Sequence, residues 1–138
     1  MDQQLLNLAR VTPPKEGWLR AVRQALGMSL EAFGKRIGAS GPTAHYIESA
    51  EVSGALTLRR LRSAAEALGC DVTVTLTPRK RLETLLQEQA LRVAREQVAR
   101  TGHSMAMEAQ GLSAEDLEIM ASEAAEEMIR RGDPRIWK

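Results

Sequence analysis

Few residues of this chain could take part in covalent or metal chemistry. It has two histidines, His45 and His103, and a single cysteine, Cys70. Neither histidine has the spacing of metal ligands or of a catalytic triad around it, and no glycine-rich phosphate loop is present. One cysteine cannot build a disulfide framework or a thiolate zinc cluster, which suits a reducing compartment. We therefore expect no enzymatic activity, no cofactor and no metal, and a cytoplasmic protein.

The charged side chains are unevenly distributed along the chain. Up to Leu82 there are 12 Lys and Arg against 7 Asp and Glu, a net charge of +5; from Glu83 onward there are 7 against 11, a net charge of −4. A basic half is compatible with nucleic acid, whereas the acidic run between Glu115 and Glu127 should avoid it. Two ordinarily solvated faces would give the same asymmetry. No stretch approaches the roughly 18 apolar residues of a membrane span.

Apolar residues recur at helical spacing in four stretches between Gly17 and Gly69. The second and third stretches are separated only by Gly38-Ala39-Ser40, which predicts a helix-turn-helix. Hydroxyl side chains that can accept hydrogen bonds from free helix amides precede the last three helices: Ser29, Ser40 and Thr57. The four helices are expected to share one core that includes Phe33 and Ile47.

The segment Cys70–Leu76 alternates apolar and polar residues, and Pro78 ends the pattern. This pattern predicts a β-strand whose apolar side chains are Val72, Val74 and Leu76. Nothing else in the chain has clear strand character, so the expected pairing partner is the same strand of a second copy, which would make a homodimer. An edge strand of another protein is the alternative partner.

Two further amphipathic helices are predicted in the C-terminal part. The first spans 81–100 and is expected to end at Thr101-Gly102; the second opens with Ser113 and Asp116 in a capping box and ends at Gly132. The pair could offer a surface to a protein partner, or could be an ordinary packed helical hairpin.

The stretch Met28-Ser29-Leu30-Glu31-Ala32-Phe33-Gly34-Lys35-Arg36-Ile37-Gly38-Ala39-Ser40-Gly41-Pro42-Thr43-Ala44-His45-Tyr46-Ile47-Glu48 resembles the helix-turn-helix of the phage-repressor-like (XRE/Cro) family. The resemblance implies that the helix beginning at Ser40 lies in the DNA major groove. The family commonly has glutamines where this chain has Leu30 and Gly41. The DNA-contacting residues expected here are Lys35, Arg36, Ser40, Gly41, Pro42, Thr43, His45, Tyr46, Arg59 and Arg60.

The order of parts, from Gly17-Trp18-Leu19-Arg20 through Ala64-Ala65-Glu66-Ala67-Leu68-Gly69-Cys70 to Thr77-Pro78-Arg79-Lys80, is similar to the "mobile mystery protein A" group of regulators. Its members are typically found beside a Fic-domain protein, which transfers AMP from ATP to hydroxyl side chains. The resemblance implies an antitoxin. Fic antitoxins supply an inhibitory helix with the pattern Ser/Thr-x-x-x-Glu-Gly/Asn, whose glutamate pairs with a toxin arginine that otherwise holds the ATP γ-phosphate.

Four pairs of residues match Ser/Thr-x-x-x-Glu: Thr12/Glu16, Thr84/Glu88, Ser104/Glu108 and Ser122/Glu126. Pro13 and Pro14 forbid a helix between Thr12 and Glu16, the first of these pairs. We expect Ser104 and Glu108 to form the inhibitory motif, because their segment resembles the corresponding family stretch. Alternatively, Ser104 caps a helix and Glu108 is solvated.

The expected protein is therefore mainly α: a lambda-repressor-like helix-turn-helix bundle, one short dimerising strand and a C-terminal helical extension. The predicted parts are an arm over 1–16, a DNA-binding domain over 17–69, a strand over 70–78 and a toxin-binding, inhibitory region over 79–138. The expected function is that of an antitoxin that blocks a Fic adenylyltransferase and binds operator DNA to regulate its own expression. The alternative is a stand-alone XRE-type repressor without a toxin partner.

Overall fold

The structure is a computed structural model that describes residues 1–6, 11–109 and 111–138, with the backbone alone at 6 and 102–109. Over these ranges it is helical, with seven α-helices, one short 3₁₀ helix and no β-strand. The chain divides into two compact units, residues 9–75 and residues 1–8 together with 76–138. None of the described helices is long and apolar enough to cross a bilayer.

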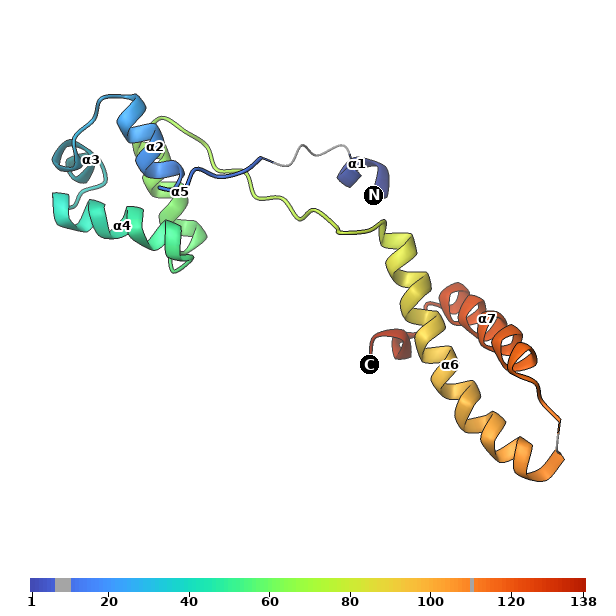
Figure 1. The fold of residues 1–138 in the computed structure, drawn as a ribbon. Helices are drawn as coiled ribbons and strands as arrows, with labels where there is room; N and C mark the ends of the chain where they lie inside the picture. Colours follow the sequence, from blue (N-terminus) through green and yellow to red (C-terminus); the bar gives the residue numbers. More distant parts are fainter. Residues whose placement is uncertain (7–10, 110) are drawn as a thin grey trace. The chain divides into compact units, whose positions relative to one another are not determined.

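Four helices build the first unit, the helix-turn-helix unit: α2 (Trp18–Ala25), α3 (Leu30–Arg36), α4 (Gly41–Ser53) and α5 (Leu58–Ala67) (Figure 1). Each helix contributes to one core, in which Phe33 is fully buried. The other buried members of this core are Leu19, Ala44, Ile47, Ala64, Ala65 and Leu68. The prediction of four helices around a shared core is confirmed.

The predicted caps set where these helices begin. The side-chain oxygens of Ser29, Ser40 and Thr57 accept hydrogen bonds from backbone N–H groups three residues later, over 3.1, 3.3 and 3.3 Å. These bonds satisfy amides that have no partner inside the helix. Gly38, just after α3, has a φ of 72°, a left-handed conformation that favours glycine and lets the chain turn sharply toward α4.

The strand predicted over 70–76 is not present in the single described chain, which does not contain the second copy expected to pair with it. In the described chain these residues are neither helix nor strand, and no backbone hydrogen bond joins residues 71–80 to other described residues. A strand requires a ladder of hydrogen bonds to a second strand, and the described part of one chain supplies none. Val72 packs against the core of the helix-turn-helix unit, whereas Val74 and Leu76 are 54% and 84% exposed.

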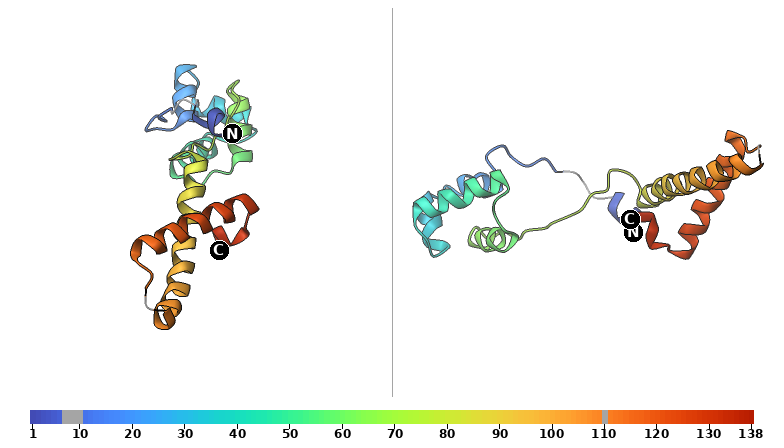
Figure 2. Two further views of the ribbon diagram at one scale, coloured as in Figure 1. Left: turned by 90° about the vertical axis from the view of Figure 1, so that its right-hand side faces the viewer. Right: turned by 90° about the horizontal axis from the view of Figure 1, so that it is seen from below.

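A helical hairpin makes up most of the second unit. The long helix α6 (Leu82–Ala109) lies beside α7 (Ala114–Arg131), as Figures 1 and 2 both show. The 3₁₀ helix η1 (Pro134–Trp137) folds back, so that Ile136 is buried against α6 and the Gln89 side chain donates to the Ile136 carbonyl over 2.7 Å. The buried core contains Ala90, Val93, Ala94, Val98, Ala121, Ala125, Met128 and Ile136.

The caps of α7 were predicted correctly. The predicted end of α6 was wrong. Ser113 and Asp116 form the predicted capping box, and Gly132 ends α7 in a left-handed conformation. Helix α6, however, continues through Thr101 and Gly102 to Ala109. A single glycine costs an exposed helix only about 1 kcal/mol relative to alanine, which does not stop a helix of this length.

The first residues of the chain belong to the same unit as α6. Asp2 lies in the short helix α1 (Asp2–Leu6), and its carboxylate accepts hydrogen bonds from the Leu82 and Glu83 amides over 2.7 and 3.2 Å. These bonds lower the pKa of the Asp2 carboxyl. Asp2 therefore caps a helix that begins 80 residues later.

Candidate nucleic-acid interface

Helix α4 has one buried face and one exposed face. Ala44, Ile47 and Ala50 are buried in the helix-turn-helix unit. The outer face presents Pro42, His45, Tyr46 and Ser49 to solvent, and Tyr46 is 60% exposed. A helix with an exposed row of short and hydrogen-bonding side chains has the shape and chemistry needed to enter a DNA major groove.

The first turn of α4 is ordered by its own side chains. The Ser40 hydroxyl accepts from the Thr43 amide and lies 3.0 Å from the Thr43 hydroxyl. Ser40 itself is exposed, whereas Gly41 and Thr43 are only partly so. Among the predicted contact residues of α4 and its cap, therefore, Ser40, Pro42, His45 and Tyr46 are exposed, and the side chains of Ser40 and Thr43 already contact each other.

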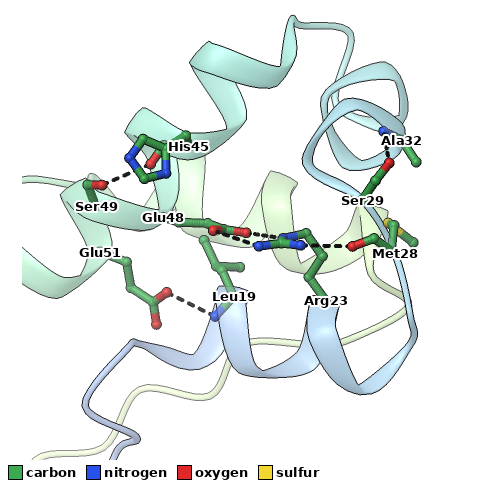
Figure 3. Close-up of polar contacts among 9 residues, drawn as sticks. All are labelled: Leu19, Arg23, Met28, Ser29, Ala32, His45, Glu48, Ser49 and Glu51. Carbon is green, nitrogen blue, oxygen red and sulfur yellow. Dashed lines mark hydrogen bonds and ion pairs between the residues drawn. The ribbon is translucent and has the colours of Figure 1, made fainter.

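Both carboxylates of α4 are bound to α2 (Figure 3). Glu48 is buried and pairs with the buried Arg23, whose guanidinium also donates to the Met28 carbonyl over 2.8 Å. Glu51 accepts hydrogen bonds from the Trp18 and Leu19 amides over 2.7 and 2.9 Å and so caps α2.

These three residues, Arg23, Glu48 and Glu51, were not predicted from the sequence. The signal was available for two of them, because Arg23 follows the buried Leu19 by four residues and Glu48 follows the buried Ala44 by four, which places each on an inward face. The consequence for the site is electrostatic. The outer face of α4 contains no acidic side chain that would repel a phosphate backbone.

The basic residues predicted to contact DNA differ in their availability. The Arg36 Nε donates to the Ala67 carbonyl over 2.8 Å, at the end of α5. Lys35 lies 3.7 Å from Glu31, and both side chains are largely exposed, so this pair is weak. Arg59 and Arg60 are exposed in the first turn of α5, and neither has an acidic partner among the described residues.

Gly34 sets the close approach of α3 to the start of α4. A Cβ atom placed on Gly34 would lie 2.7 Å from the Ser40 carbonyl carbon and oxygen. Only glycine allows this contact, so Gly34 fixes how closely the N-terminus of α4 packs against α3. The sequence showed glycine at this position, but the tight contact could be seen only in the structure.

The predicted inhibitory residues lie in a different part of the chain. Ser104 and Glu108 are both inside α6, although their side chains lie outside the described residues. Thr12 and Glu16 lie outside any helix. Glu88 accepts from Lys80 over 2.8 and 2.9 Å. No cluster of His, Cys, Asp and Glu suited to a metal ion occurs among the residues that the structure describes.

Comparison with known proteins agrees with this geometry. The family model described as "Helix-turn-helix" matches residues 19–74, which run from α2 to the segment after α5. No curated protein and no solved structure matches the chain. The matched range contains the core, the buried Arg23–Glu48 pair and the exposed face of α4. Residues 19–74 therefore form a helix-turn-helix domain of the XRE type.

Proposed function

We propose that this protein is a transcriptional regulator that binds operator DNA through α4. The observation that supports the proposal best is the charge distribution in the helix-turn-helix unit. The two carboxylates of α4 face α2, while Arg59 and Arg60 stand exposed at the start of α5, without an acidic partner among the residues that the structure describes. Binding of phosphates by such arginines positions a protein on DNA, and base edges are then contacted from the groove. His45 and Tyr46 offer the hydrogen-bonding groups for that role.

The experiment is a measurement of DNA affinity against salt concentration, with DNA selected from a random pool. Each phosphate contact that is lost should reduce the slope of log affinity against log salt by about 1. The variant that combines Arg59→Ala and Arg60→Ala should therefore have a flatter slope. Arg92→Ala is the matched control, because this exposed arginine of α6 pairs with Glu96. If the double variant has the same slope as the unsubstituted protein, these arginines do not contact phosphates.

A homodimer formed by the segment 70–78 belongs to the same proposal. Helix-turn-helix proteins read two half-sites when a two-fold axis relates two copies. The alternating sequence, the unpaired backbone and the exposed Val74 and Leu76 support pairing between two copies. Val74→Pro removes a hydrogen-bond donor and should make the protein monomeric in analytical sedimentation. Dimers of unchanged stability in this variant would place the interface elsewhere.

We further propose that the C-terminal unit inhibits a Fic-domain adenylyltransferase, as the resemblance to Fic antitoxins implies. The continuous helix α6 supports this proposal, since residues 104 and 108 lie four apart on one helix and so on one face. The carboxylate of Glu108 would form an ion pair with the toxin arginine that otherwise orients the ATP γ-phosphate. Of the other matching pairs, Thr12/Glu16 is not helical and Glu88 is bound to Lys80.

The test uses the complex with a Fic-domain protein encoded beside this chain and measures AMP incorporation. Glu108→Gly should preserve the complex and release AMP transfer, while Glu88→Gly, Glu16→Gly and Glu126→Gly should stay inhibitory. If one of these three control variants releases AMP transfer instead, the inhibitory motif is the pair that contains the substituted glutamate. If no variant releases activity, or if no Fic-domain protein binds, the stand-alone repressor is the better description.

A further inference from the structure

Beside residues 71–75 of the segment 71–77, whose backbone has no partner among the described residues, lies an open, largely apolar groove of about 570 Å³ within the helix-turn-helix unit. Val11 and Trp18 line it on one side; Leu61 comes from α5 and Leu68 directly follows this helix. Val72 and Thr75 belong to the segment itself, so the unpaired backbone forms one wall. Trp18 remains 47% exposed and Val11 70% exposed in this single chain.

The segment contains the side chains that could fill such a groove. Val74 and Leu76 are exposed, and they stand two and four residues after Val72, which is half-buried against the core. In an extended segment these three side chains lie on one face. A single chain thus presents an apolar groove and, next to it, two apolar side chains without cover.

Antiparallel pairing of two copies restricts the register. Residues directly opposite each other in an antiparallel pair lie on the same face. If the two-fold axis passes between two consecutive residue positions, each valine lies opposite a threonine of the partner. If the axis passes through one residue position, apolar residues lie opposite apolar residues and the apolar face stays continuous. With the axis at Val74, the two Val74 residues face each other and Val72 lies opposite the partner's Leu76.

We propose that a second copy of this chain occupies the groove, with the strands paired about Val74 and the partner's Leu76 covering Trp18. This inference rests on the proposed homodimer and adds its register and its groove contact. Val72 links the two observations, since it lines the groove and also faces the partner's Leu76 in this register. By symmetry, both grooves are filled at once, so the interface is self-complementary. The neutral sequence from Val72 to Leu76 also suits an apolar site.

Disulfide trapping tests the register. In a Cys70→Ser background, Val74→Cys should form a covalent dimer on oxidation, because directly opposite residues lie within the Cα separation that a disulfide allows. Val72→Cys alone and Leu76→Cys alone should stay uncrosslinked, and a mixture of these two should crosslink. Crosslinking of Val72→Cys alone, or failure of Val74→Cys in a protein that sediments as a dimer, would overturn the register. A protein that sediments as a monomer would instead contradict the homodimer itself.

Tryptophan fluorescence tests the groove. In a Trp137→Phe background Trp18 is the only tryptophan. Dimer formation should shift its emission to shorter wavelength and reduce quenching by acrylamide, and Leu76→Ser should reverse both changes. Leu26→Ser is the control, because Leu26 is an exposed residue of the same unit that does not line the groove. The proposal fails if Leu76→Ser leaves Trp18 as shielded as before, or if Trp18 is equally shielded in the monomer obtained by dilution, since the chain itself would then fill the groove.

Discussion

At the scale of single residues, the buried pair of Arg23 and Glu48 joins α2 to α4, the helix proposed to bind DNA. Both side chains are at least nine-tenths buried, and the Arg23 guanidinium also donates to the Met28 carbonyl just before α3. Helical spacing places each residue on an inward face, but spacing alone does not reveal that an opposite charge stands across the core. The identity of this pair therefore depends on tertiary structure.

Removal of one partner should be costly. Glu48→Ala leaves the Arg23 charge buried without its carboxylate, and breaking a buried pair in this way costs about 3–5 kcal/mol of unfolding free energy. Replacing both residues with apolar ones of similar size should cost much less. Urea denaturation followed by Trp18 fluorescence, in a Trp137→Phe background, measures both effects. Glu31→Ala, which removes an exposed pair with Lys35, is the control and should change stability by no more than about 0.5 kcal/mol.

Gly34 gives a second residue-scale prediction. Gly34→Ala adds a Cβ that would lie 2.7 Å from backbone atoms of Ser40, so α4 must move away from α3. We expect a loss of about 1–3 kcal/mol, the usual cost of overpacking, together with weaker DNA binding. Gly41→Ala is matched to it, because its Cβ would meet Glu31 at 3.6 Å, an ordinary contact. Equal stability of the two variants would contradict the assigned role of Gly34.

At the scale of elements, the sequence predicted the parts that depend on local interactions. Caps at Ser29, Ser40, Thr57 and Ser113 act within one helical turn, and all four form as predicted. One prediction of the same kind was wrong: Gly102 does not end α6, because the helix propensity around it outweighs one glycine. The strand predicted over 70–76 is not present in the single chain, because pairing is not a property of one segment, and it stays a prediction for the dimer.

Acid should weaken the caps of the second unit. The hydroxyl and amide of Ser113 hold the pKa of Asp116 below its usual range, and Arg135 lowers the pKa of Asp133 to about 2. A carboxyl group with a lowered folded-state pKa stabilises the protein above its unfolded pKa and loses that contribution as the pH falls. Helical circular dichroism and Trp137 fluorescence should therefore change between about pH 4 and about pH 2. Ser113→Ala should move the change to higher pH, and an unmoved transition would show that the capping box does not contribute.

At the scale of the whole molecule, each of the two units has a hydrophobic core and a tryptophan of its own. The core around Phe33 uses residues from α2 to Val72, and the core around Ala94 uses residues from Leu86 to Ile136, with no residue shared. Trp18 belongs to the first unit and Trp137 to the second. This division could be anticipated from the charge asymmetry and the change of pattern at Pro78, whereas the inclusion of Asp2 in the second unit could not, because that contact spans 80 residues.

Separate cores predict separate unfolding. Phe33→Ala removes a fully buried aromatic ring, which costs about 3–5 kcal/mol, and it should lower the melting temperature that Trp18 reports while leaving the one that Trp137 reports unchanged. Ala94→Asp, which places a carboxylate at a fully buried position of α6, should have the opposite pattern. Thermal melts of Trp137→Phe and Trp18→Phe proteins, each with and without the core substitution, separate the two signals. A shift of both transitions by either core substitution would mean that the units unfold together, and an effector bound by one unit could then alter the stability of the other through that coupling.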